Sequence, residues 1–220
     1  MAQKIQAEIV SVRPLNDTIW QYILKPKQFI PYQAGQYLQI HKPDGVHFYS
    51  IANAPYAEQH YELHVRHRSS SPLGKAGESI FLSLPYGCCD LRHLYVDRPI
   101  LFLAFGTGFV PIRAMIQALL HQQDPRWIEL HWGIGTKEDE YDRVSIEQWQ
   151  QLIHEFHYHS HITASNDSEV ISSWLKHYGD LKTCQIVMAG PFDLMLRLKK
   201  ECLNLGMNPS MLFSDAFEFA

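Results

Sequence analysis

Cysteine is scarce in this chain of 220 residues, which contains only Cys88, Cys89, Cys184 and Cys202. No two of them have the Cys-x-x-Cys spacing, so the sequence predicts neither a cysteine-ligated zinc site nor an iron–sulfur cluster. They are also too few for a disulfide-stapled fold. We therefore expect a protein of a reducing compartment, the cytoplasm.

Long apolar runs and an excess of basic charge are missing as well. The most apolar stretch, residues 99–105, is too short to cross a bilayer, and the first residues lack the apolar region of a secretory signal. The net charge of −4 argues against a dedicated nucleic-acid binder, whose phosphate contacts need a basic face. Hydrophobic residues make up 46% of the chain, which is enough to bury a core, so we expect a soluble globular protein.

Apolar and polar residues alternate in the first half of the chain. Ile5, Ala7 and Ile9 interleave with polar neighbours, and residues 60–65 and 79–84 show a similar alternation. A period of two predicts strands with one buried face. Because turn-forming residues such as Asp44-Gly45 separate the strands, the first half is expected to form an antiparallel β-barrel or sandwich.

Strand and helix patterns alternate in the second half. Apolar runs predict buried strands at 99–105, 127–132, 160–163 and 184–189. Segments with a helical period lie at 110–122, 145–156, 168–178 and 192–205. This alternation is typical of a parallel sheet in a Rossmann-like α/β domain. The sequence thus predicts two domains, residues 1–97 and residues 98–220.

Two turns that follow predicted strands favour nucleotide binding. Gly106, Thr107 and Gly108 open a helix with Pro111 in its first turn, and Gly190-Pro191-Phe192 opens another. Glycine lets the backbone approach a phosphate, and the free N–H groups of a helix N-terminus attract it. A plain strand–turn–helix connection explains either turn alone. Both turns, however, follow the carboxyl ends of parallel strands, the edge at which open α/β sheets bind ligands.

The order of three segments resembles that of a known family. Ala-Gly-Gln-Tyr-Leu at 34–38, Val-His-Phe-Tyr-Ser-Ile-Ala at 46–52 and the Gly-Thr-Gly turn at 106–108 occur in the order seen in the ferredoxin–NADP reductase superfamily. That family has a flavin-binding barrel followed by a nicotinamide-binding domain. The chain length and the ending at 213–217, Phe-Ser-Asp-Ala-Phe, are similar to those of the small bacterial NAD(P)H:flavin oxidoreductases.

The resemblance implies roles for particular residues. Ser50 is the catalytic candidate, since it stands at the serine whose hydroxyl hydrogen-bonds flavin N5. The implied flavin-binding residues are Tyr37, His47, Phe48, Tyr49, Ser50, His64, Asp215 and Phe217. The implied NAD(P)H-binding residues are Gly106, Thr107, Gly108, Pro111, Gly133, Lys137, Gly190, Pro191 and Phe192. Without the resemblance, such aromatic residues would be interpreted as core and Ser50 as an ordinary strand serine.

Departures from the family pattern indicate how the ligands are held. His47 replaces an arginine that meets the flavin phosphate in tight binders, and the segment 67–77 lacks the Gly-x-x-Ser turn of those proteins. A flavin held loosely, by its ring, is therefore expected, although Arg66 and Arg68 keep FMN and FAD open as well as riboflavin. The acidic residues at 138–140 and 142, offset only by Lys137 and Arg143, favour NADH over NADPH.

Three histidines, His157, His159 and His161, are spaced to share one strand face. Three imidazoles could bind a metal ion. We favour a polar strand face and expect no metal, because no carboxylate partner is evident in the sequence.

The expected activity is hydride transfer from NAD(P)H to a flavin that leaves reduced, with oxygen, ferric iron or a separate monooxygenase as possible acceptors. One alternative is a reductase subunit with tightly bound FAD that serves a separate iron–sulfur or monooxygenase protein. A second alternative is a non-catalytic flavin- or nucleotide-binding module. Neither nucleic acid nor membrane is expected as a partner.

Overall fold

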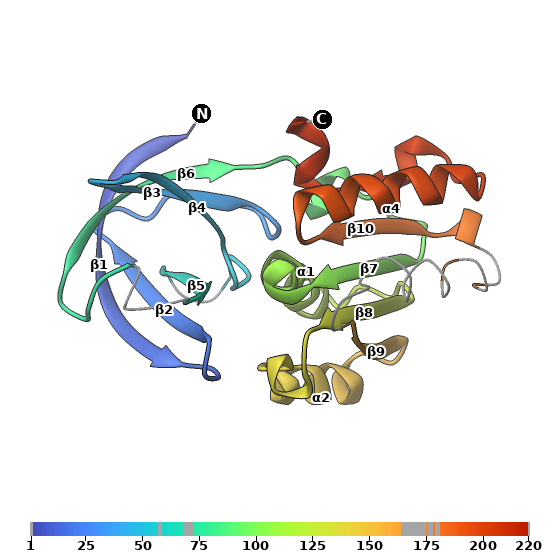
Figure 1. Ribbon diagram of the computed structural model, residues 1–220, viewed down its shortest axis with the longest axis horizontal. Coiled ribbons are helices and arrows are strands. Elements are labelled where there is room, and N and C mark those ends of the chain that lie inside the picture. Colours follow the sequence, from blue (N-terminus) through green and yellow to red (C-terminus); the bar gives the residue numbers. More distant parts are fainter. Residues whose placement is uncertain are drawn as a thin grey trace. The chain divides into compact units, whose positions relative to one another are not determined.

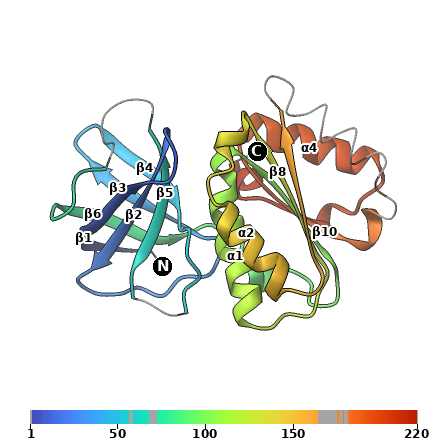
Figure 2. The ribbon, with the colours of Figure 1, turned by 90° about the horizontal axis from the view of Figure 1, so that it is seen from below.

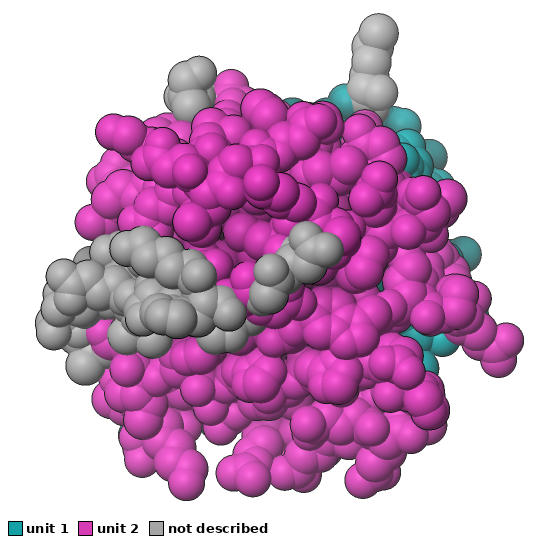
Figure 3. Space-filling model, turned by 90° about the vertical axis from the view of Figure 1, so that its right-hand side faces the viewer, with its two compact units in different colours: residues 1–92, 110–121 teal, residues 93–109, 122–220 magenta. Residues whose placement is uncertain are grey.

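The computed structural model describes residues 2–56, 59–67, 73–163, 175, 178 and 181–219. The chain divides into two compact units (Figure 3). The first unit contains residues 1–92 and 110–121, and the second contains residues 93–109 and 122–220. The predicted division at residues 97/98 stays a prediction of the sequence.

The first unit is built on a curled antiparallel sheet, which in the described residues has six strands in the order β4-β3-β6-β1-β2-β5 (Figure 1). The strands are β1 (Gln3–Pro14), β2 (Ile19–Pro26), β3 (Tyr37–Lys42), β4 (Gly45–Ser50), β5 (Tyr61–Arg66) and β6 (Ser79–Tyr86). A short 3₁₀ turn, η1, spans Leu91–His93. The sequence prediction of an antiparallel β-domain in the first half is confirmed, with the sheet curled as a half-barrel.

Alternating side chains form the core of this sheet. Ala7 and Ile9 of β1 are buried together with Leu82 and Leu84 of β6, as a period of two predicts. Strand β1 pairs with both β2 and β6, and a register shift between Ile9 and Ser11 interrupts its ladder with β2. The predicted turn at Asp44-Gly45 joins β3 to β4, with Gly45 at a φ of 134° that favours glycine.

Most of helix α1 (Phe109–His121) belongs to the first unit. Gln117 accepts a hydrogen bond from the backbone N–H of Ala54 (3.1 Å). The ring of His121 stacks on that of Tyr56, with centroids 4.4 Å apart. These contacts attach the helix to the segment that follows β4.

The second unit contains a parallel sheet, with five strands in the described residues in the order β11-β10-β7-β8-β9. The strands are β7 (Ile100–Phe105), β8 (Ile128–Ile134), β9 (Phe156–Ile162), β10 (Gln185–Ala189) and β11 (Leu212–Phe213). Its helices are α2 (Arg143–Leu152) and α4 (Phe192–Asn204). Short 3₁₀ turns are η2 (Gly106–Gly108), η3 (Lys137–Asp139), η4 (Leu181–Thr183), η5 (Pro209–Met211) and η6 (Asp215–Phe219).

Helices α2 and α4 cover opposite faces of this sheet (Figure 2). On the α4 face, Leu194 and Leu198 pack into one cluster with Leu103 of β7. On the other face, Trp149 of α2 lies 6.1 Å from the ring of Phe109. This arrangement confirms the predicted α/β domain. None of the helices in the described part of the chain is long and apolar enough to cross a membrane.

The strand β9 differs most from the sequence prediction. It begins at Phe156, whereas the sequence predicted a helix up to residue 156 and a strand only from 160. The residues between 157 and 161 are polar and mostly exposed, so no apolar run marks the strand. The helix α2 accordingly ends earlier than predicted, at Leu152. The predicted helix at 168–178 lies almost entirely outside the described residues.

Candidate functional site

Three aromatic rings and a hydroxyl share one face of the sheet in the first unit. Tyr37 is the cross-strand partner of both Ser50 and Tyr86, so these side chains point to the same side. The ring of Tyr37 stacks on that of Tyr86 with centroids 5.7 Å apart, and its edge meets Phe48 at 6.0 Å. Phe48 is 60% exposed. We call Tyr37, Phe48 and Tyr86 the aromatic face; it presents apolar ring surface next to the partly exposed Ser50.

His47 and Tyr49 lie on the opposite side of β4 from the aromatic face, because side chains alternate along a strand. The imidazole Nε2 of His47 lies 3.1 Å from Oδ1 of Asp44, and this hydrogen bond holds the pKa of Asp44 below its usual range. Tyr49 packs against the core of the sheet, and its burial raises the pKa of its phenol. Of the implied flavin residues on these strands, the structure thus brings Tyr37, Phe48 and Ser50 together and separates His47 and Tyr49 from them.

His64 belongs to a buried polar cluster. Its Nε2 lies 2.8 Å from Oε1 of Glu62, which also accepts a hydrogen bond from Gln21. The guanidinium of Arg113 is 3.6 Å from the other carboxylate oxygen. Burial raises the pKa of Glu62, but the hydrogen bond from His64 and the charge of Arg113 outweigh it and lower this pKa to about 2. A charged Glu62 therefore sits inside the unit.

The same cluster fixes the backbone just after Ser50. Arg113 donates a hydrogen bond to the carbonyl of Ala52 (2.8 Å), and the N–H of Ala52 donates to the carbonyl of Glu62 (2.8 Å). The N–H of Ile51 donates to the carbonyl of Gln36 (3.1 Å). Sequence reasoning missed Glu62 and Arg113. The only signal in the sequence is that each is a charged residue within a segment of otherwise regular apolar period, residues 60–65 for Glu62 and residues 110–122 for Arg113.

In the second unit, the Gly106–Gly108 turn connects β7 to α1, and Pro111 stands in the first turn of that helix. Gly106 adopts a φ of 51°, and its carbonyl accepts a hydrogen bond from the indole of Trp132 (2.9 Å). A Cβ on Gly108 would lie 2.0 Å from the carbonyl oxygen of Ala189. Only glycine fits at position 108. The sequence suggested that this backbone approaches a phosphate, but the close contact in the structure is with the backbone of β10.

The second predicted turn therefore lies beside the first. Gly190 and Pro191 follow β10, and Phe192 begins α4 with its side chain 42% exposed. A Cβ on Gly190 would come within 2.8 Å of the side chain of Phe105, the last residue of β7. The expectation that both turns meet at one edge of the sheet is met by these contacts. The ligand roles of these residues stay predictions.

The end of β8 supplies a third turn at this edge. Gly133 packs under the ring of Phe105, where a Cβ would lie at 2.7 Å. Lys137 begins the 3₁₀ turn η3 and is exposed. Of the two cations that could offset the acidic residues here, Arg143 is already engaged, since its Nε lies 2.8 Å from Glu147.

Asp215 and Phe217 lie in the 3₁₀ turn η6 of the second unit. The ring of Phe217 packs against the apolar cluster under α4, and the ammonium of Lys199 lies 4.2 Å from its centroid. Their implied contact with the flavin stays a prediction, as does that of His64.

The row of histidines on β9 needs a correction. The sequence offered no carboxylate partner, but Glu129 of the neighbouring strand β8 lies 3.1 Å from Nε2 of His159. His131 of β8 also contacts this carboxylate. Sequence reasoning examined a single strand and missed both residues, which the parallel register brings onto the same face.

Comparison with known proteins finds similarity to an NAD-binding domain and to two reductases. Residues 102–200 match the family model of the oxidoreductase NAD-binding domain. An NAD(P)H-flavin reductase of Aliivibrio fischeri is 27% identical over 98% of this chain and 99% of its own length. A CDP-6-deoxy-L-threo-D-glycero-4-hexulose-3-dehydrase reductase of Yersinia pestis is 29% identical over 88% of this chain, which spans only 62% of that relative.

A solved structure shares the two-domain fold. The ferredoxin NADP+ reductase of Neisseria gonorrhoeae with bound FAD and NADP superposes with a TM-score of 0.79 at 15% identity, over 97% of this chain and 98% of the other. This likeness shows the fold, and residues 102–200 are in addition similar in sequence to an oxidoreductase NAD-binding domain. The chain thus resembles the ferredoxin–NADP reductase superfamily, in sequence over residues 102–200 and in fold over nearly its whole length.

Proposed function

We propose that the protein is an NAD(P)H:flavin oxidoreductase, which transfers a hydride from the nicotinamide to a flavin that binds loosely and leaves reduced. The flavin supplies a ring nitrogen, N5, that accepts the hydride. No side chain has to ionise for this transfer, so the protein contributes by binding and orienting the two ligands.

The observation that carries the proposal is the aromatic face with Ser50 beside it. Tyr37 and Phe48 offer apolar ring surface to a planar, partly apolar ligand, and the paired register sets the Ser50 hydroxyl on the same side. A hydroxyl both donates and accepts hydrogen bonds. Ser50 is thus suited to an unprotonated ring nitrogen and to the N–H that replaces it after reduction.

Loose binding is supported by the surroundings of His47. This residue stands where tight binders carry an arginine, and its imidazole is hydrogen-bonded to Asp44. An imidazole lacks the two-pronged geometry with which a guanidinium holds a phosphate. We infer that ring contacts dominate and that riboflavin, FMN and FAD are all accepted.

For the nucleotide, we propose the glycine turns as the pyrophosphate site. Gly108 and Gly190 pack the two turns closely together at the carboxyl edge of the sheet, and α1 and α4 begin there with the N–H groups of their first turns. NADH is the preferred donor, because Glu138 and its acidic neighbours would repel a 2′-phosphate and Arg143 is paired with Glu147.

The proposal is tested by NADH and NADPH oxidation with added riboflavin, FMN or FAD. We expect oxidation that depends on added flavin, a saturable flavin KM, faster turnover with NADH and protein that loses its colour on gel filtration. A colourless protein that neither binds a flavin nor shows flavin-dependent oxidation would exclude the activity.

Replacing Ser50 by alanine tests its catalytic role. One lost hydrogen bond to the reacting ring corresponds to about 1.5–3 kcal/mol, so kcat should fall roughly 10- to 100-fold while the KM for NADH stays unchanged. Ser79→Ala is the matched control, because Ser79 is an exposed serine on β6. Equal kcat values for Ser50→Ala and wild type would remove Ser50 from the mechanism.

A second function is favoured by the Yersinia relative, which is named as the reductase of a dehydrase and is longer than this chain. In that case the protein would keep FAD tightly and pass electrons to a separate iron–sulfur or monooxygenase partner. A yellow protein that retains its flavin through gel filtration, and that reduces added flavin poorly, would support this function over the first.

A further inference from the structure

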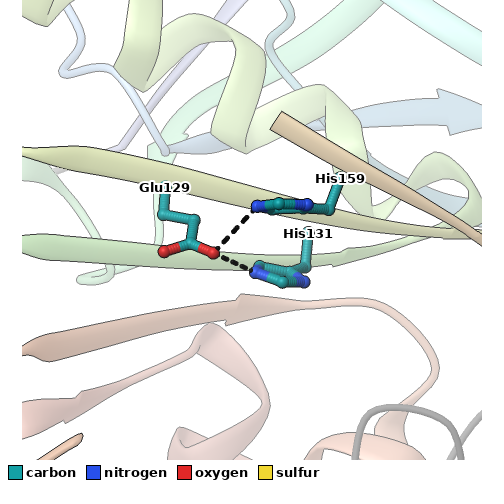
Figure 4. Close-up of side chains that lie close together, drawn as sticks. All are labelled: Glu129, His131 and His159. Carbon is teal, nitrogen blue, oxygen red and sulfur yellow. Dashed lines mark hydrogen bonds and ion pairs between the residues drawn. The ribbon is translucent and has the colours of Figure 1, made fainter. Parts of the chain in front are cut away.

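The parallel register of β8 and β9 brings acidic and imidazole side chains onto one face of the second unit's sheet. His131 is the direct partner of His159, and Glu129 stands two residues before His131 on the same strand. Neighbouring parallel strands lie about 4.8 Å apart and residues two apart along a strand about 6.6 Å, so these three side chains can converge. Figure 4 shows them doing so.

The donor atoms of the three residues lie close together. Oε1 of Glu129 is 2.7 Å from Nε2 of His131 and 3.1 Å from Nε2 of His159. One ligand atom from each residue, an imidazole nitrogen or a carboxylate oxygen, lies within 4.8 Å of the other two. His131 is fully buried and Glu129 is nearly so, whereas the His159 side chain is 50% exposed. The buried residues Glu129 and His131 thus form the inner side of the cluster, and an ion from solvent can reach it past the half-exposed His159.

We propose that Glu129, His131 and His159 form a binding site for a divalent transition-metal ion, Zn²⁺ by preference. Two imidazoles and one carboxylate match the ligand types that zinc takes in proteins, with bonds of about 2.0–2.2 Å. Tetrahedral ligands at that distance are about 3.4 Å apart. A small outward movement of the half-exposed His159 ring and of the carboxylate reaches this spacing, and a fourth position is left for water.

A second layer of contacts supports this arrangement. Nδ1 of His131 lies 2.7 Å from Nε2 of His161, so it can donate a hydrogen bond there once Nε2 of His131 carries the metal. The hydroxyl of Tyr178 donates to the other oxygen of Glu129 (3.1 Å). Metal-ligating histidines and carboxylates usually have such partners, which fix the ring orientation and the tautomer. His161 and Tyr178 are the positioning residues of the site.

The bound ion would join β9 to its neighbour β8. Because the site exists only when these strands are paired, the ion binds the folded state and should raise its stability in proportion to the logarithm of the free zinc concentration. The flavin and nucleotide residues discussed above take no part in the site, so zinc binding and flavin reduction can be tested separately.

The experiment uses the full chain without a polyhistidine tag, stripped with a chelator, and compares wild type with three variants. Zn²⁺ is titrated by calorimetry, and thermal unfolding is recorded with and without the ion. His159→Gln removes a half-exposed ligand and Glu129→Gln removes the carboxylate charge. His157→Gln is the matched control, because His157 lies on the same strand and face but its ring contacts Trp127 instead.

We expect one zinc ion per chain for wild type and His157→Gln, with a higher unfolding temperature when zinc is present. His159→Gln and Glu129→Gln should bind at least about tenfold more weakly and lose the thermal shift. Co²⁺ should give the visible absorption bands of a four-coordinate site only in wild type and His157→Gln. Equal zinc affinity in all four proteins, or no stoichiometric binding to wild type, would overturn the proposal and leave a hydrogen-bonded polar cluster.

Discussion

Replacing Glu62 by glutamine tests the electrostatics of the buried cluster in the first unit. The carboxylate pKa is lowered from 4.5 to about 2 in the folded protein. This difference corresponds to about 3 kcal/mol of stability at neutral pH, since one pKa unit is about 1.4 kcal/mol. Glutamine keeps the shape but removes the charge that faces Arg113 and His64. Glu62→Gln should therefore unfold about 3 kcal/mol more easily at pH 7.

The sign of the pH dependence follows from the lowered pKa. The contribution of Glu62 is complete above the unfolded pKa of 4.5 and is lost as the pH falls toward the folded pKa of about 2. The difference in the free energy of unfolding between wild type and Glu62→Gln, measured in urea, should thus shrink to roughly half or less by about pH 3.

A control separates this effect from that of any carboxylate. Glu147 contacts Arg143 at 2.8 Å, but both side chains are exposed to solvent. Glu147→Gln should change the free energy of unfolding by less than about 0.5 kcal/mol, with no closing gap at low pH. A Glu62→Gln protein as stable as wild type at pH 7, or a gap that does not change with pH, would refute the reasoning about a buried charge.

Two further predictions concern the second unit. Gly108→Ala places a Cβ 2.0 Å from the carbonyl oxygen of Ala189, so it should lower the free energy of unfolding in urea by about 3 kcal/mol or more and weaken NADH binding in a titration. Gly135→Ala is the control, because the atom nearest to its Cβ, at 3.0 Å, is a movable carboxylate oxygen. Both measurements should change less in this variant. Trp132→Ala empties a fully buried site stacked on Phe109 at 4.0 Å, and should lower the free energy of unfolding by about 3–5 kcal/mol in urea, whereas a loss below 1 kcal/mol would contradict this packing.

The division into an antiparallel and a parallel half could be predicted from the sequence because each has its own hydrophobic period. Strand β7 is buried along its whole length, and its continuous apolar run made it easy to recognise. The turn at Gly106–Gly108 was also predictable, since glycine marks positions where a Cβ does not fit. Strand β9 was mostly missed, because an edge strand with polar side chains has no such run.

The polar clusters could not be predicted, because they depend on pairing between segments. Glu62 contacts Arg113, which follows 51 positions later on helix α1. The hydrophobic period predicts that helix but not the place where it packs. Glu129 meets His159 only because β8 and β9 are parallel neighbours in a particular register. A shift of that register by one residue would move one set of side chains to the other face. Sequence spacing along one strand therefore cannot reveal such a cluster.

The close contact between Gly108 and β10 has a consequence for how these positions can evolve. The close neighbour of Gly108 is the backbone carbonyl of Ala189, a group that every residue type possesses, and not the methyl side chain of Ala189. Selection for packing should therefore keep position 108 as glycine while leaving the side chain at position 189 open to change. Residue 189 can then acquire new chemistry beside the second turn without disturbing the first, so among relatives we expect variety at one position and uniformity at the other.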